Sequence, residues 1–142
     1  MPGLSGGNNN LYTISLLRSA QKKGFKCGTV LFRGSSGIPI TSSKLSCSVS
    51  WFDAQAITEY CVKEYVVDKE TGKKTRNIYA YGCSLGANIL GLYLAKVADK
   101  CPLDGSVLYA TPWDLTSGSN FFYTNMFGIY AYAVGMNLSR LI

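Results

Sequence analysis

The sequence predicts an α/β fold in which a small parallel sheet is flanked by helices. Segments with the helical spacing of apolar residues alternate with short apolar runs that are rich in β-forming residues. The intervening helical segments are long enough for right-handed crossovers, so the strands are expected to run parallel. Only about three strands are found, which leaves unpaired edges, and we therefore expect them to be part of a larger sheet.

The expected order begins and ends with a helix and alternates helices with strands. The first helix follows the asparagines at 8–10 and ends at Gly24, a residue suited to a C-terminal cap. The second helix begins at Ser50, and Asp53 follows three residues later, as in a capping box. The remaining segments are a helix over 87–98, a C-terminal helical segment over 121–142, and strands over 25–32, 77–81 and 105–110.

Composition indicates one folded domain. The chain has 142 residues, of which 47% are hydrophobic and 15% charged, which argues against an intrinsically disordered chain. Part of the net charge of +6 lies in residues 68–76, which also contain two acids. A solvated turn explains this mixed run better than a contact with nucleic acid or anionic lipid, because no larger basic face with interleaved aromatics accompanies it. We therefore expect no nucleic-acid partner.

The cysteines and the terminal segments bear on the compartment. The five cysteines are odd in number, contain no C-x-x-C pair and have no histidine to join them, which argues against a disulfide framework and a zinc site. An intracellular, reducing compartment fits best. No signal peptide or amino-terminal membrane anchor is recognised. Residues 115–139 lack charge, but interrupting asparagines favour an amphipathic helix that touches lipid or a partner over a membrane span.

A G-x-S-x-G pattern, from Gly82 to Gly86, joins a predicted strand to a predicted helix. Such a sharp turn lifts the central serine, Ser84, above the sheet, and glycines are needed where side chains would collide with the strand and helix. The N–H of Leu85 would lie at a helix N-terminus, where it can stabilise an oxyanion. A tight turn with an incidental serine is the alternative. A second match, over residues 3–7, has no preceding strand.

Four segments occur in an order and spacing that resemble the α/β-hydrolase-domain family of serine esterases and lipases: PGLSGGNNNLY, LFRGSSGIPIT, YGCSLGANILGLYL and CPLDGSVLYATPWDL. The nearest branch has a P-G-L-T-G oxyanion loop and a P-W-D-L motif. The resemblance implies that residues 1–118 are the central part of a hydrolase core and that residues 119–142 begin a helical cap. It implies hydrolysis of carboxylic esters, including acylglycerols and phospholipids, and residues 119–142 could contact a membrane surface or a protein.

The resemblance also assigns roles to residues. Ser84 would be the nucleophile, and the N–H groups of Leu4 and Leu85 would form the oxyanion hole. The alternative for the loop around Leu4 is a disordered tail. No metal or organic cofactor is implied, because serine acyl transfer needs none.

The absence of histidine is the main departure from the family pattern. Asp114 is a weak candidate for the catalytic acid, and a loop-capping aspartate is the better interpretation. Without a general base the Ser84 hydroxyl is a poor nucleophile. Two hypotheses remain: part of a serine ester hydrolase, nearly inactive as this chain alone, or a non-catalytic, hydrolase-like interaction subunit of a larger assembly.

Overall fold

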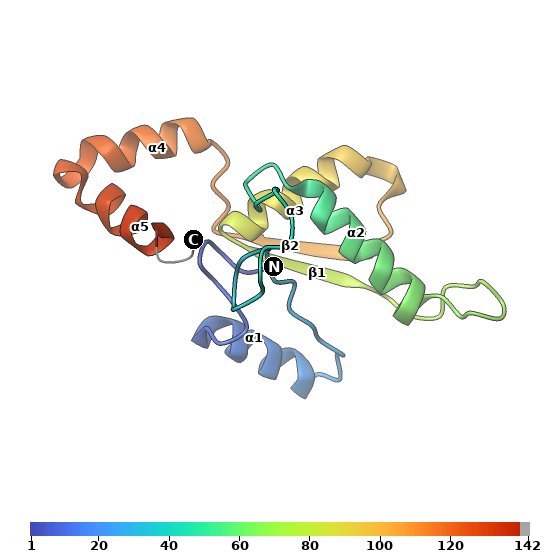
Figure 1. Cartoon of the computed structure of the whole chain (residues 1–142). Coiled ribbons are helices and arrows are strands. Elements are labelled where there is room, and N and C mark those ends of the chain that lie inside the picture. Colours follow the sequence, from blue (N-terminus) through green and yellow to red (C-terminus); the bar gives the residue numbers. More distant parts are fainter. Residues whose placement is uncertain (140–142) are drawn as a thin grey trace. The chain divides into compact units, whose positions relative to one another are not determined.

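Two parallel strands and the helix between them form the centre of the fold. In the computed structural model, which describes residues 1–139, β1 spans Tyr79–Cys83, α3 spans Leu85–Val97 and β2 spans Gly105–Tyr109 (Figure 1). The strands pair in parallel, from Tyr79 opposite Gly105 to Cys83 opposite Tyr109. The helix packs against both strands, as a crossover between parallel strands requires.

The chain divides into two compact units. The first unit contains Met1–Gly3 and Cys47–Thr111, and the second contains Leu4–Ser46 and the chain from Pro112 onward. Besides β1, α3 and β2, the first unit has α2 (Trp51–Cys61), a π-helical turn η1 (Val62–Val66) and a short 3-10 helix η2 (Ala98–Lys100). The second has α1 (Leu11–Lys22), α4 (Leu115–Thr124), the 3-10 turn η3 (Asn125–Gly128) and α5 (Ile129–Ser139).

The core of the first unit lies along α3. Ile89, Leu90 and Tyr93 are almost completely buried, and the small residues Ala54 of α2 and Ala87 of α3 let the backbones approach closely. Full burial of each isoleucine or leucine side chain stabilises the fold by about 1.5–3 kcal/mol. The other face of the two-stranded sheet carries Tyr79, Val107 and Tyr109, which are 53%, 56% and 61% exposed.

Met1 extends the pairing of β1 on the side away from β2. Its amino group donates to Tyr81 O at 2.7 Å, and its carbonyl oxygen accepts from Cys83 N at 3.1 Å. These two bonds are the pattern of a parallel bridge between Met1 and Gly82. At its C-terminal end β1 therefore has hydrogen-bonded neighbours on both sides. Burial lowers the pKa of the Met1 amino group from 8.0 to about 6.

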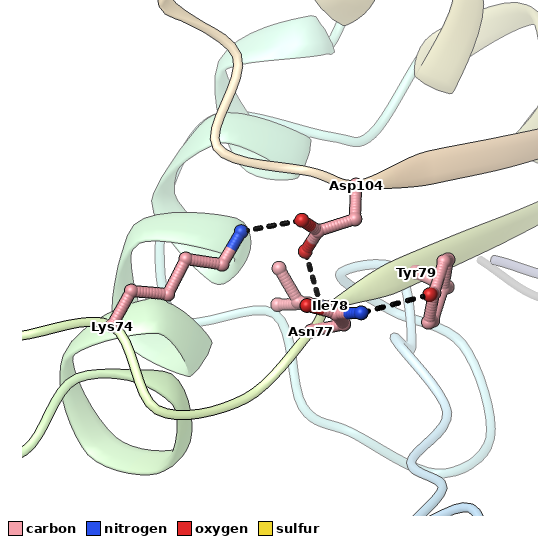
Figure 2. Close-up of polar contacts among 5 residues, drawn as sticks. All are labelled: Lys74, Asn77, Ile78, Tyr79 and Asp104. Atoms are coloured by element: carbon pink, nitrogen blue, oxygen red, sulfur yellow. Dashed lines mark hydrogen bonds and ion pairs between the residues drawn. The ribbon is translucent and has the colours of Figure 1, made fainter.

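Asp104 connects the starts of the two strands (Figure 2). Its backbone N–H donates to Ile78 O, and its Oδ2 accepts from Ile78 N, both at 2.8 Å. Lys74 Nζ forms an ion pair with Asp104 Oδ1 at 2.6 Å. The pKa of Asp104 is lowered, chiefly by the hydrogen bond from Lys74. The charged segment preceding β1 is an exposed turn, closed by an antiparallel bridge between Val67 and Lys74.

The partial α/β fold is confirmed, but the predicted strand over 25–32 is wrong. This segment has no strand, and its residues 25–28 are exposed. A β-rich sequence becomes a strand only where a neighbour completes its hydrogen-bonded ladder, and residues 1–139 provide none for this segment. The sheet of the described chain therefore has two strands instead of about three.

The predicted helices are present with changed ends. Gly24, at φ +86°, closes α1, and Gly24 N and Phe25 N donate to Gln21 O and Ala20 O, as in a Schellman motif. The expected capping box is wrong, because Ser50 makes no side-chain cap and its Oγ instead accepts from Cys47 N.

The C-terminal helical segment begins earlier than predicted, at Leu115, and breaks where Met126 and Phe127 have positive φ. Residues 140–142 of the predicted segment lie outside the described residues. Among the helices described, none combines the length and the apolar character needed to cross a bilayer.

Candidate active site

Ser84 occupies a strained turn between β1 and α3. Its φ of 51° and ψ of −118° lie in a region that non-glycine residues rarely adopt. The surrounding structure holds this conformation: Ser84 N donates to Tyr109 O at 2.9 Å, and Ser84 O accepts from Ala87 N and Asn88 N at 2.9 and 3.0 Å. Such strain typically costs about 1–3 kcal/mol and is concentrated at functional sites.

The two glycines of the turn are in close contact with backbone. A Cβ on Gly82 would lie 2.6 Å from Ala87 Cα and from Gly86 O. A Cβ on Gly86 would overlap Pro2 O and lie 2.5 Å from Met1 O. Neither contact can be relieved by moving a flexible side chain, so the turn requires glycine at both positions.

Gly3 also lies against the turn, which the sequence did not predict. A Cβ on Gly3 would lie 3.2 Å from Ser84 Cβ and 3.8 Å from Ser84 Oγ. The Met1–Gly82 bridge brings the segment here, and a single residue of strand pairing gives no periodic signal. The Pro2-Gly3 dipeptide was the only local indication that the chain turns closely at this point.

The two predicted oxyanion donors lie in different units. Leu85 is the first residue of α3, so its N–H has no intrahelical acceptor and lies at the positive end of the helix dipole. Leu4 belongs to the second unit. It is 45% exposed, its carbonyl oxygen accepts from Ser5 Oγ at 2.7 Å, and Ser5 has a φ of 55°.

Asp114 makes local contacts typical of a helix cap. Its Oδ1 accepts from Ser117 N at 2.8 Å, and its Oδ2 accepts from Ser117 Oγ at 2.6 Å, at the N-terminus of α4. These hydrogen bonds lower the pKa of the carboxyl group. Each oxygen of the carboxylate thus accepts a hydrogen bond within its own loop.

Within residues 1–139 no group hydrogen-bonds to Ser84 Oγ. Neighbouring Cys83 is half-buried, and strand alternation puts it on the opposite face of β1 from Gly82, which contacts α3. None of the five cysteines forms a disulfide within the described residues. The structure thus holds Ser84 in a strained turn, and no proton acceptor among the described residues hydrogen-bonds to its hydroxyl.

Comparison with known proteins identifies several relatives. Embryogenesis-associated protein EMB8 of Picea glauca is 32% identical over 126 residues, which are 89% of this chain and 26% of that protein. Medium-chain fatty acid ethyl ester synthase/esterase 2 of Saccharomyces cerevisiae is 30% identical, with 80% of this chain and 24% of that protein covered. Monoacylglycerol lipase of the same yeast is 27% identical, with 99% and 30% covered.

The chain therefore spans between 24% and 30% of the length of these three relatives. No protein-family model matches the sequence. No solved structure matches it significantly.

Proposed function

Since this chain belongs to the α/β-hydrolase family of esterases and lipases, we propose that it contains the nucleophile of a serine carboxylic-ester hydrolase. The observation that carries the proposal is the backbone of Ser84, held at positive φ between β1 and α3 by hydrogen bonds on both sides. The close packing of Gly82 and Gly86 supports it, because these contacts fix the turn that exposes the serine.

The proposed reaction has two acyl transfers. Ser84 Oγ attacks the ester carbonyl carbon, and the alcohol leaves with a proton as the acyl-Ser84 ester forms. Water then attacks this ester, releasing the carboxylic acid and restoring the Ser84 hydroxyl. The N–H groups of Leu85 and Leu4 would stabilise the oxyanion in both steps. Relatives named for monoacylglycerol and for medium-chain fatty acid ethyl esters favour lipid esters as substrates.

We expect the 142-residue chain alone to be nearly inactive. It contains no histidine, and a serine hydroxyl without a general base stays protonated near neutral pH. Loss of one member of such a catalytic unit lowers the rate by orders of magnitude. We therefore propose that the base and the catalytic acid come from sequence outside these residues. Asp114 is not assigned as the acid, because its carboxylate caps α4.

The alternative is a non-catalytic interaction subunit. The exposed tyrosines and valine on the free face of the sheet favour it, since an apolar patch of this kind often marks an interface. On either proposal, residues 119–142 begin a cap that contacts a membrane surface or a partner; within them Phe121, Tyr123 and Phe127 are exposed.

Labelling with a fluorophosphonate probe distinguishes the two proposals. The protein made from its natural reading frame should react, and the Ser84→Ala variant should not. Ser43→Ala is the matched control, because Ser43 is an exposed loop serine. Equal labelling of Ser84→Ala and the unmodified protein would exclude Ser84 as nucleophile, whereas no labelling of either would favour the interaction subunit.

Added imidazole tests the missing base in the 142-residue chain itself. Positioned general bases contribute about 10²–10⁴-fold, so a diffusing imidazole should restore a small part of this. We expect imidazole to increase acylation of Ser84 by p-nitrophenyl acetate, measured by mass spectrometry of the protein. The increase should be absent in Ser84→Ala. Equal acylation of the two proteins would contradict the assignment of Ser84.

A further inference from the structure

A cavity of about 710 Å³ lies in the first unit at the C-terminal end of α3, the end farther from Ser84. It is bounded by the end of α2, the π-helical turn η1, the turn before β1 and the segment leading into β2. Its volume is in the range of sites that bind drug-sized ligands. The proposed ester hydrolysis at Ser84 does not involve this cavity.

The hydrophobic part of the cavity wall comes from several elements. Val62 lies in η1, Val67 precedes the charged turn, Val97 ends α3 and Pro102 precedes β2. Tyr93 of α3 is also in the wall. Its pKa is raised to about 12, mainly by burial, so its phenol is neutral at physiological pH. A ligand in contact with these side chains would bury apolar groups.

Three lysines line the same cavity, at positions 63, 69 and 100, together with the acids Glu59 and Asp68. Lys69 Nζ is already paired with Glu64 at 2.8 Å. Within the described residues Lys63 and Lys100 form neither a hydrogen bond nor an ion pair.

Both acids have local partners. Asp68 Oδ1 accepts from Thr71 N at 2.8 Å and from Thr71 Oγ1 at 2.7 Å. Glu59 Oε1 accepts from Gln55 Nε2 at 2.7 Å. These donors are uncharged, so both carboxylates keep their charge, but neither forms an ion pair with Lys63 or Lys100 in the part of the chain that the structure describes. The two ammonium groups therefore remain available to an anionic ligand.

The backbone beside Lys63 is unusual. Residues Val62–Val66 form a π-helical turn directly after α2, and Val62 and Lys63 are both part of the cavity wall. Single π-helical turns are rare and occur frequently at functional sites. The π-helical turn therefore supports a ligand site in this cavity independently of the cavity volume.

From the apolar wall, the unpaired lysines and the π-helical turn, we propose that this cavity binds a monoanionic amphiphile of the fatty-acid class. The alkyl chain contacts the valines and Pro102, and the carboxylate lies near Lys63 and Lys100. The proposal does not depend on Ser84 chemistry. Fatty acids and other amphiphiles with one negative charge share an alkyl chain and a single anionic group. The dependence of affinity on the length of the alkyl chain tests the contact with the apolar wall.

The test is a ¹⁵N-HSQC titration of the 142-residue chain with octanoate, decanoate, 1-octanol and acetate. We expect octanoate to shift amide signals of Gly72, Val97 and Lys100. Each buried CH₂ increases affinity about fourfold, so decanoate, which has two more CH₂ groups, should bind roughly fifteenfold more tightly than octanoate. Acetate, which lacks the chain, and 1-octanol, which lacks the charge, should bind more weakly.

Charge variants give the matched control. Lys63→Ala with Lys100→Ala should weaken octanoate binding roughly fivefold, as expected for the loss of two partly exposed charge contacts. Lys73→Ala with Lys96→Ala removes the same charge outside the cavity wall and should leave it unchanged. Equal effects of the two pairs, or no binding of decanoate at all, would overturn the proposal.

The Ser84→Ala variant separates this proposal from the proposed hydrolase function. Octanoate should bind the cavity of that variant as it binds the unmodified chain. Shifts confined to residues around Ser84 would place the ligand at the elbow and overturn the cavity proposal. Shifts at Val97 and Lys100 would support it, whether or not Ser84 reacts with the fluorophosphonate probe.

Discussion

Replacement of Gly82 by alanine should push β1 away from α3 and destabilise the first unit. The added Cβ would lie 2.6 Å from Ala87 Cα and from Gly86 O, and 2.8 Å from Ala87 N. Ordinary van der Waals contact is 3.4–4 Å, so strand and helix backbones must separate by nearly 1 Å. The same displacement would disturb the hydrogen bonds from Ala87 N and Asn88 N that hold Ser84 at positive φ.

The expected loss of stability in Gly82→Ala is the difference between two opposing contributions. Overpacking of a well-packed interior costs about 1–3 kcal/mol. Alanine in place of glycine stabilises the folded state by about 0.5–1 kcal/mol, because glycine loses more conformational freedom on folding. The free energy of unfolding should therefore fall by roughly 1–2 kcal/mol. With a urea dependence of about 2 kcal/mol per molar, the middle of the usual range for small proteins, the unfolding midpoint should drop by roughly 0.5–1 M.

Tryptophan fluorescence measures this effect in the unit where it occurs. The chain has two tryptophans, Trp51 in α2 of the first unit and Trp113, which is 75% exposed, in the second. In a Trp113→Phe background the fluorescence change on urea unfolding reports Trp51 alone. Gly105→Ala is the matched control, because its Cβ would approach the exposed Tyr79 ring, at 3.3 Å, and not backbone.

We expect Gly105→Ala to leave the midpoint nearly unchanged, since an exposed ring can move aside. If Gly82→Ala behaves in the same way, the separation of β1 and α3 is not limited by Gly82, and our account of the elbow glycines is incorrect. Fluorophosphonate labelling of Ser84 in the protein made from its natural reading frame should fall together with the midpoint. Undiminished labelling would show that the elbow tolerates the displacement.

Three further changes test local features of the structure. Asp114→Ala should reduce helical circular dichroism because α4 loses its side-chain cap, whereas Asp114→Asn should retain the signal; equal losses would contradict the cap. A buried Met1 amine with a pKa of about 6, against 8.0 when exposed, is destabilising when protonated, so the free energy of unfolding should rise by roughly 2 kcal/mol from pH 6 to pH 8. Amino-terminal acetylation, which keeps one N–H donor, should abolish that rise, and an unchanged slope would refute the assignment. Asp104→Ala should accelerate hydrogen exchange of the Ile78 amide, while Lys74→Ala should change it little; equal acceleration would show that the ion pair, not the hydrogen bond, protects this amide.

The parts of the fold that could be predicted are those specified by residues that lie close together in the sequence. The apolar patterns located β1, α3 and β2 to within two residues, and Gly24 located the end of α1. The segment over 25–32 has the same β-rich composition, yet it is not a strand. Composition alone does not reveal whether a neighbouring strand will be present to complete its hydrogen bonds.

The candidate site likewise has one part that could be predicted from local sequence and one part that could not. The elbow around Ser84 could be recognised because a strand, five residues and a helix specify it locally. The contact of Gly3 with Ser84 could not, because it depends on hydrogen bonds between Met1 and β1, some 80 positions away. The break at Met126 and Phe127 was also missed, since neither residue favours positive φ and no glycine or proline precedes them to signal it.

The elbow and the base are separable requirements of the proposed chemistry. The hydrogen bonds that hold the Ser84 backbone come from β2 and α3, both within the first unit. Deprotonation requires a group of suitable pKa within hydrogen-bonding distance, and a sequence without histidine lacks the usual one. On the proposed function, this chain has the backbone geometry of the elbow, while the reactivity of Ser84 depends on a base from outside these residues. That is why the imidazole experiment, which changes the base without changing the fold, tests the function of Ser84 more directly than the geometry of its turn.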